Sequence, residues 1–365
     1  NEDFFVPQDV YTNMETYIAN GEKAEQEWNE LFAKYEEAYP ELASEYKKWH
    51  ELDVTDELLN DKDFWKFEKG CATRQASGDV LNKLTSFIPN LMGGSADLAP
   101  SNKSDMKNTG FFSKEDRSGQ NIHFGVREHA MAAITNAIAA HGGLKAYCAT
   151  FFVFSDYMKG AMRLSALMNL PVTYILTHDS IGVGEDGPTH QPIEQLAALR
   201  SLPNMTVFRP ADPNETAAAW FYAVTNKTTP TSLVLTRQNL PLYDIDGKVA
   251  LKGAYILKDS KNETPDVILM ASGSEVELIM GAADELAKKG VDARVVSMPS
   301  FELFEAQSDE YKESVLPKAV RNRVAVEAAS TFGWHKYVGL DGEVIGLDHF
   351  GASAPAGTLF KEFGF

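Results

Sequence analysis

The alternation of apolar and polar positions changes character along the chain, and the first 70 residues differ from the rest. Stretches 22–38 and 41–49 place aromatic and aliphatic side chains at helical spacing on an acidic background. Each such helix has only one apolar face, which must lie against another surface. We therefore expect residues 1–70 to form a helical arm or linker.

From residue 71 to residue 245, short apolar runs alternate with amphipathic stretches. The apolar runs predict strands at 91–92, 122–124, 145–149, 172–177, 205–209 and 231–236. The amphipathic stretches predict helices at 72–86, 128–141, 153–168, 192–200 and 213–226. Pro213 follows Asp212 at one helix start, as proline does in a first turn. Strands that alternate with helices indicate a mostly parallel sheet covered by helices.

A second unit of the same kind is predicted for residues 246–365. Its strands are expected at 267–271, 292–297 and 323–327, with a helix at 275–289 that Gly290 ends. Residues 238–262 predict a linker with a short hairpin-like stretch. The fold class is therefore α/β, with two domains (71–245 and 246–365), each built on a mostly parallel, helix-covered sheet.

Composition and charge narrow the classes of function. The net charge is −18, much of it within residues 1–70, and no basic stripe exists, which argues against nucleic-acid binding. No apolar run approaches the roughly 20 residues of a membrane-spanning helix. The two cysteines, Cys71 and Cys148, match no metal or redox spacing, and sparse cysteine favours the cytoplasm. The first residue is Asn1, so we expect the chain to come from a longer one.

The densest group of polar side chains follows the apolar run 172–177. This loop contains His178, Asp186 and His190, and glycines that allow tight backbone turns. Polar side chains at the carboxyl end of a strand are where α/β sheets usually bind ligands. Two histidines and a carboxylate suggest acid–base chemistry or a metal site. The spacing of twelve and the lack of a third ligand favour acid–base or hydrogen-bonding roles.

Two further features could carry chemistry or belong to the scaffold. Glu128 begins a helix directly after a strand, where it either complements the helix dipole or shares a proton with a ligand nitrogen. The aromatic residues at 151, 154 and 157 are three apart and predict one side of a helix. That side either belongs to the core or forms a stacking platform for a flat ring, with Phe152 pointing into the core.

Basic and glycine-containing positions give candidate anion sites. Arg74 and Arg237 could clamp a phosphate or act as structural arginines. Gly273 and Ser274 open a helix and could bind an anion, whereas Ser272 or Ser274 could simply cap that helix.

Taken together, these stretches resemble transketolases, which are thiamine diphosphate enzymes. The resemblance is carried by residues 93–102, 125–131, 177–191 and 235–240, and it extends to 294–299 and 350–355. It implies a thiamine-diphosphate-binding fold followed by a transketolase C-terminal-like domain. The implied reaction is transfer of a two-carbon ketol unit from a ketose phosphate to an aldose phosphate, in the pentose phosphate pathway.

The resemblance implies a role for each matched residue. Glu128 would hydrogen-bond the ring nitrogen of the aminopyrimidine, and His190 would approach the amino group of the cofactor and the reacting oxygen. The pyrimidine ring would lie against three aromatic side chains, Phe151, Phe154 and Tyr157. The sugar phosphate would contact Arg74, Ser101, His178, Asp186, His190 and Arg237. Asp97 would lie near a subunit interface.

One motif of the family has no match. The family's metal motif contains Gly-Asp-Gly, but the only Gly-Asp here, Gly78-Asp79, precedes Val80. We therefore expect thiamine diphosphate and Mg²⁺ (or Ca²⁺) in the complete enzyme, no metal ligand in this chain, and no retention of the cofactor by this chain alone. Residues 1–70 would then be the tail of the diphosphate-binding domain and its connecting arm.

The resemblance also implies partners. It implies a homodimer that acts on xylulose 5-phosphate, ribose 5-phosphate, sedoheptulose 7-phosphate, glyceraldehyde 3-phosphate, erythrose 4-phosphate and fructose 6-phosphate. Two alternatives are an inactive dimeric fragment and one half of a split transketolase that needs a companion chain. The sibling enzymes deoxyxylulose phosphate synthase and the 2-oxoacid dehydrogenase β-chain share the fold, but the arginine and histidine set argues against them.

Overall fold

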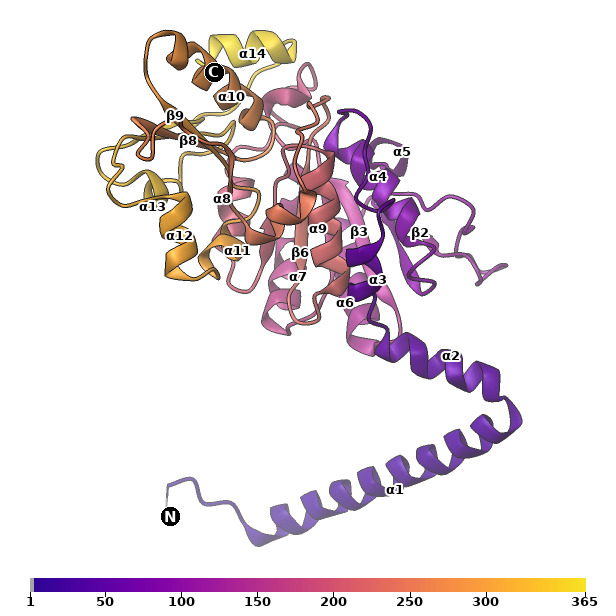
Figure 1. Cartoon of the computed structure of the whole chain (residues 1–365). Helices are drawn as coiled ribbons and strands as arrows, with labels where there is room; N and C mark the ends of the chain where they lie inside the picture. Colours follow the sequence, from indigo (N-terminus) through magenta and orange to yellow (C-terminus); the bar gives the residue numbers. More distant parts are fainter. Residues whose placement is uncertain (1–2) are drawn as a thin grey trace. The chain divides into compact units, whose positions relative to one another are not determined.

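The computed structural model describes residues 3–365, which divide into two compact units, 3–52 and 53–365 (Figure 1). The first unit consists of helices α1 (Gln8–Ala38) and α2 (Pro40–Glu51). Its helical character is as predicted, although α1 begins well before residue 22. Among the described residues, no helix has the length and apolar character needed to cross a bilayer.

The second unit begins with α3 (Thr55–Asn60) and contains two sheets. The first sheet is entirely parallel, in the order β2-β1-β3-β4-β6-β5. Its strands are β1 (Leu91–Ser95), β2 (Asn121–His123), β3 (Lys145–Phe151), β4 (Thr173–Thr177), β5 (Thr206–Phe208) and β6 (Thr231–Leu235). This arrangement confirms the predicted α/β class.

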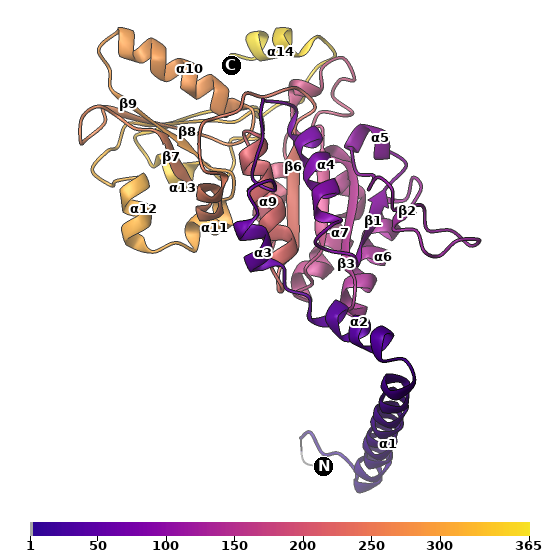
Figure 2. The same ribbon diagram turned by 45° about the vertical axis from the view of Figure 1, so that its right-hand side comes forward.

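Helices pack against the first sheet, and α4 and α9 contact each other along it (Figure 2). They are α4 (Thr73–Leu84), α5 (Ala99–Asn102), α6 (Glu128–His141), α7 (Ser155–Leu167), α8 (Gln195–Arg200) and α9 (Pro213–Thr225), with single 3₁₀ turns η1 (Phe152–Phe154) and η2 (Ile181–Val183). The Asp212 carboxylate accepts a hydrogen bond from the Glu215 amide at 2.8 Å and so caps α9. Phe152 is fully buried in the core, as predicted, and so is Cys148.

The second sheet has the order β11-β10-β8-β9-β7, and only β7 runs antiparallel. Its strands are β7 (Tyr255–Lys258), β8 (Val267–Ala271), β9 (Ala293–Ser297), β10 (Arg323–Val326) and β11 (Glu343–Ile345). The remaining helical elements are η3 (Gly247–Lys252), α10 (Glu275–Lys288), α11 (Phe301–Glu305), α12 (Asp309–Val315), α13 (His335–Val338) and α14 (Ala356–Glu362).

The hairpin-like stretch predicted within residues 238–262 is wrong. Residues 247–252 form the helical turn η3, and β7 pairs with β9, about 40 residues further along the chain. The physical reason is that the buried Tyr255 is held by a distant partner, because its hydroxyl donates to Glu215 of α9 at 2.8 Å.

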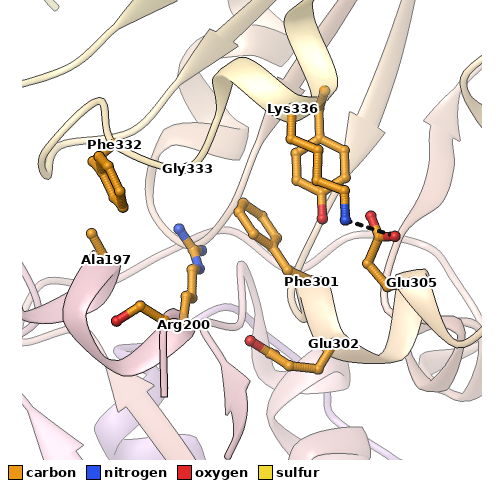
Figure 3. Close-up of a pocket in the computed structure, with 10 residues that line it drawn as sticks. Ala197, Arg200, Phe301, Glu302, Glu305, Phe332, Gly333 and Lys336 are labelled. Atoms are coloured by element: carbon orange, nitrogen blue, oxygen red, sulfur yellow. Dashed lines mark ion pairs between the residues drawn. The ribbon is translucent and has the colours of Figure 1, made fainter. Parts of the chain in front are cut away.

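Buried charges join the two sheets. The guanidinium of Arg209, fully buried just after β5, contacts Asp179 at 2.9 Å and Glu275 at 2.5 Å. Arg200, at the end of α8, pairs with Glu327 at 2.7 Å and lies 3.8 Å from the centre of the Phe301 ring. Figure 3 shows Arg200 beside Phe301 in a pocket of about 330 Å³ between the two sheets' helices. Arg209 and Arg200, which lie on the first sheet's side, thus pair with carboxylates of the second sheet's side. Because these pairs are buried, the low local dielectric strengthens their attraction.

The start of α10 does not serve as an anion site, nor do the serines cap it as predicted. Ser274 stands at the N-cap position but donates its hydroxyl to Glu275 at 2.6 Å, and Ser272 donates to Glu327 at 2.5 Å. Arg209 approaches this helix end and donates to the Ser272 carbonyl at 2.9 Å. The start of this helix is therefore filled by the buried ion pair of Arg209 with Glu275.

The contact between α9 and the second sheet predicts a dependence of stability on pH. Glu215 is fully buried and accepts hydrogen bonds from Tyr255 and Ser297. Burial, reinforced by the charge of Asp212, raises the pKa of Glu215 from 4.5 to about 7. Because the folded state holds this proton more tightly, the resulting stabilisation is complete below pH 4.5 and is lost as pH rises through 7.

We therefore expect the melting temperature to fall between pH 6 and pH 8, and Glu215→Gln to flatten this fall. Thermal melts of both proteins across that interval measure the slope, which is independent of any constant cost of the substitution. Glu277→Gln, which changes an exposed carboxylate of α10, is the control and should keep the wild-type slope. A Glu215→Gln protein with the wild-type slope would contradict the assignment.

Candidate active site

The predicted site residues gather at one edge of the first sheet. All six strands are parallel, so their carboxyl ends meet at the same edge. Phe151 ends β3, His178 directly follows β4, and Arg237 follows β6 by two residues. Ser101 and Glu128 lie on the helices that come next after β1 and β2. Residues spread over more than 130 positions are therefore brought to a single ligand-facing edge.

Arg74 is the centre of a polar cluster at this edge. It lies at the start of α4, and Thr73 beside it donates its amide to the Thr236 hydroxyl at 3.0 Å. The Arg74 guanidinium donates to the Ser101 carbonyl at 3.0 Å and lies 3.4 Å from Nε2 of His178. Arg74 is thus in direct contact with Ser101 and His178, the residues that the family resemblance assigned with it to the sugar phosphate.

His178 is neutral and has a defined hydrogen-bonding role. Burial, together with the positive charges of Arg74 and Arg237, lowers its pKa to about 3. Thr177 donates its hydroxyl to Asn102, so the contact of 2.8 Å between Thr177 and Nδ1 of His178 requires the proton to be on Nδ1. Nε2 is then an acceptor, directed at Arg74. This nitrogen therefore orients the guanidinium and adds no charge.

The aromatic residues do line up, although not on one helix as predicted. Phe151 is the last residue of β3, Phe154 lies in η1 and Tyr157 lies on α7. The strand continues to Phe151 because the run stays buried and no glycine or proline interrupts it. Phe151 and Phe154 are stacked with centroids 5.9 Å apart and an angle of 13°, and Tyr157 lies 6.1 Å beyond Phe154.

Both histidines of the 178–191 loop approach these rings. The ring centroid of His178 lies 3.8 Å from that of Phe151. His190 lies edge-on to Phe154 at 5.5 Å and to Phe151 at 6.2 Å. Asp186, in the same loop, is exposed. The loop therefore lies between the polar cluster of Arg74 and the aromatic row.

Glu128 is the first residue of α6 and is buried, with 8% of its surface exposed. Its position near the positive end of the helix dipole stabilises a carboxylate there. A buried carboxyl and a row of aromatic rings at one sheet edge fit a flat heteroaromatic ring with a basic nitrogen. By contrast, residues 3–365 contain no group of three or more His, Cys, Asp or Glu side chains that could hold a metal ion.

Several residues near the site were missed by sequence reasoning. Asp179 follows His178 and is buried against Arg209, while Gln191, the last residue of the 178–191 loop, is also buried. The only signal in the sequence was the position of Arg209, a charged residue directly after an apolar strand. Nothing local in the sequence indicated its partners, which lie 30 and 66 residues away.

Three family models match this chain, and all describe transketolase domains. Residues 69–242 match the transketolase pyrimidine-binding domain, 253–365 the transketolase-like C-terminal domain, and 1–53 the transketolase thiamine diphosphate binding domain. Among curated proteins, a transketolase of Bacillus subtilis is 57% identical over 373 residues, covering all of this chain and 55% of the relative. One of Halalkalibacterium halodurans is 52% identical over the same shares.

Solved structures give the same answer. A transketolase of Pichia stipitis in complex with sedoheptulose 7-phosphate superposes with a TM-score of 0.88 at 45% identity, covering 99% of this chain and 54% of that one. A chain described as a split-gene transketolase, inactive β4 tetramer, superposes with a TM-score of 0.64 at 26% identity, covering 81% of this chain and 94% of that one.

The chain thus spans about half the length of the curated relatives that it matches. Within that span, the matched domain models together account for most of its residues, and identity to curated transketolases extends from end to end. This chain therefore belongs to the transketolase family.

Proposed function

We propose that this chain supplies the pyrimidine half of a transketolase active site. The reaction is transfer of a two-carbon ketol unit from a ketose phosphate to an aldose phosphate. The observation that carries the proposal is the edge of the first sheet, where the Arg74 cluster and the row of aromatic rings lie on either side of the 178–191 loop. The first can bind a sugar phosphate and the second a flat cofactor ring.

Sugar phosphates are the substrates we infer from the charge at this edge. Arg74 and Arg237 both act electrostatically on His178, so two cations converge where a phosphate would bind. Ser101 and the neutral His178 would complete the phosphate site, and Asp186 would contact a hydroxyl of the donor sugar. Related Pichia stipitis transketolases were crystallised with xylulose 5-phosphate and fructose 6-phosphate, which supports this substrate class.

Thiamine diphosphate is the cofactor we infer. When bound, it supplies an electron sink that stabilises the two-carbon carbanion. Glu128 would hold a proton at the pyrimidine nitrogen, and the aromatic row would orient the ring and exclude water. His190 would donate a hydrogen bond to the reacting oxygen. The diphosphate and its Mg²⁺ (or Ca²⁺) would be held by a diphosphate-binding domain.

We infer that this diphosphate-binding domain acts with the chain either in one polypeptide or as a companion. The split-gene transketolase among the structural neighbours supports the second arrangement as the alternative. We also propose a homodimer in the cytoplasm. Helices α6 and α7, with the residue that follows α7, expose large apolar side chains, namely Ile134, Leu164, Leu167 and Met168. They support the dimer, since monomeric proteins rarely expose several such side chains together.

A chimera tests the proposed function. In it, the matching part of the Bacillus subtilis transketolase is replaced by this chain; we call this protein the complete chimera. With thiamine diphosphate and Mg²⁺, it should transfer a ketol unit from xylulose 5-phosphate to ribose 5-phosphate. A folded complete chimera without this activity, beside an active relative, would contradict the proposal.

Arg237→Ala in the complete chimera should weaken binding of phosphorylated donors. Loss of a charge-assisted hydrogen bond costs about 1.5–3 kcal/mol, which corresponds to a KM roughly 10- to 150-fold higher. Steady-state kinetics with xylulose 5-phosphate and with xylulose measure the effect, which should be confined to the phosphorylated donor. Arg117→Ala, at an exposed loop position, should change neither. Equal losses for both donors would refute the phosphate role.

A further inference from the structure

Residues 253–365 contain the second sheet and its helices. The first residues of the 178–191 loop are attached to this region. Asp179, next to His178, is 2% exposed, and its carboxylate accepts from Arg209 at 2.9 Å. The same guanidinium donates to Glu275 of α10 and to the Ser272 carbonyl after β8. The start of the loop is thereby fixed to the carboxyl edge of the second sheet.

The far end of the loop is attached in a different way. The Gln191 amide donates to the Gly184 carbonyl at 2.8 Å and to the Ala352 carbonyl at 2.9 Å. The Ser353 hydroxyl donates to the Glu185 carbonyl at 2.5 Å. Two of these bonds, Gln191 to Ala352 and Ser353 to Glu185, tie the loop to the segment 352–353, and the third, Gln191 to Gly184, closes the loop on itself. None of the three reaches the first sheet.

The middle of the loop also packs against 253–365. Ile181 is fully buried in a cluster with Leu347 and Leu359. The loop also has turn bonds of its own, from the Gly187 amide to the Gly184 carbonyl and from the His190 amide to the Gly187 carbonyl, each at 3.0 Å. Gly184 and Gly187 have positive φ values, +84° and +78°, that glycine adopts freely. The internal bonds shape these turns, and the contacts with residues 253–365 hold the turns in place.

We propose that Gln191 and Ser353 are positioning residues that hold the 178–191 loop so that His190 lies against Phe154. Residues 253–365 thereby act as the frame of this loop, with the Asp179–Arg209 pair fixing its start. Apart from its ring contacts, at 5.5 Å and 6.2 Å, the hydrogen bonds of His190 stay within the loop: its amide donates to the Gly187 carbonyl at 3.0 Å, and Nδ1 lies 2.9 Å from the Thr189 hydroxyl. The bonds of Gln191 and Ser353 to the rest of the chain therefore help to place it. The catalytic consequence rests on the proposed function, whereas the placement of His190 does not.

The test uses the full 365-residue chain with labelled histidine rings. Gln191→Met removes both amide bonds at nearly constant volume, and Ser353→Ala removes the third. The ring resonances of His190 report its contact with Phe154 and Phe151 through ring currents. We expect them to move toward the position of a free histidine in each variant and further in the double variant, while those of His178 stay in place.

Gln307→Met is the matched control, since it makes the same substitution at a glutamine whose amide donates to a backbone carbonyl outside the loop, that of Leu303 at 2.9 Å. It should leave the His190 signals unchanged. His190 signals that stay in place in Gln191→Met and in the double variant would overturn the proposal. So would equal displacement of His190 in the Gln307→Met control.

A second readout addresses the reaction. In the complete chimera, Gln191→Met should lower kcat about tenfold, the lower end of losses from misplaced groups, with little change in KM for xylulose 5-phosphate. Displaced His190 signals with unchanged kcat would overturn the catalytic part of the proposal. If the unmodified complete chimera is inactive, the proposed function fails, and the histidine signals alone decide whether Gln191 and Ser353 position the loop.

Discussion

Glu128→Gln should nearly abolish ketol transfer by the complete chimera while the protein remains folded. The substitution keeps the shape and a hydrogen-bonding amide but removes the proton relay at the pyrimidine nitrogen. General acid–base groups contribute roughly 10²- to 10⁴-fold to rate, so we expect turnover to fall by about that factor. Steady-state kinetics measure the loss, and thermal melts on the same samples measure folding.

The control separates catalysis from the helix dipole. Glu277 lies in the first turn of α10, and Glu128 lies in the first turn of α6. Glu277 is exposed, whereas Glu128 is buried. Either substitution removes a favourable charge–dipole interaction of about 0.3–1 kcal/mol. Glu277→Gln should therefore lower stability slightly and leave turnover intact. If Glu128→Gln behaves in the same way, its role is structural only.

Arg209→Met should produce the largest loss of stability. The substitution leaves the carboxylates of Asp179 and Glu275 buried without their cation. Removing one partner of a buried ion pair typically costs about 3–5 kcal/mol. Burial already raises the pKa of Asp179 against the opposing effect of Arg209, so the orphaned carboxyl should take up a proton instead of remaining charged. Denaturant unfolding of the 365-residue chain measures the loss.

Two further variants show whether the loss of stability comes from the unpaired buried charges. Arg321→Met breaks an exposed pair with Asp341, which should cost about 0–1 kcal/mol. The triple variant Arg209→Met, Asp179→Asn, Glu275→Gln removes all three charges together and should recover much of the lost stability. A loss for Arg209→Met no larger than that for Arg321→Met would show that this network does not stabilise the joined sheets.

The sequence predicted the parallel core well because its strands and helices carry strong local signals. The bounds predicted for α6 and β8, 128–141 and 267–271, are those of the structure. The short helices α11 to α14 and strand β11 were missed. Strand β11 has two exposed residues out of three, so it has no apolar run to identify it. The domain boundaries after residues 70 and 245 stay predictions.

The site could be predicted only as a set of residue types. Residue patterns marked Arg74 and His178, the family resemblance added Ser101, and the parallel topology explains why they meet. The contacts that hold the 178–191 loop join residues as far apart as Gln191 and Ala352, which no local pattern encodes. Tertiary packing also decides the protonation of His178, because burial and two arginines that are distant in sequence set its pKa.

The most direct test of the central claim compares this chain alone with the complete chimera. Ketol transfer from xylulose 5-phosphate to ribose 5-phosphate is measured with thiamine diphosphate and Mg²⁺, on material shown by mass spectrometry to contain one polypeptide. We predict transfer by the complete chimera and none by the 365-residue chain, because the chain supplies only the pyrimidine half of the site. Turnover by the chain alone would contradict this account.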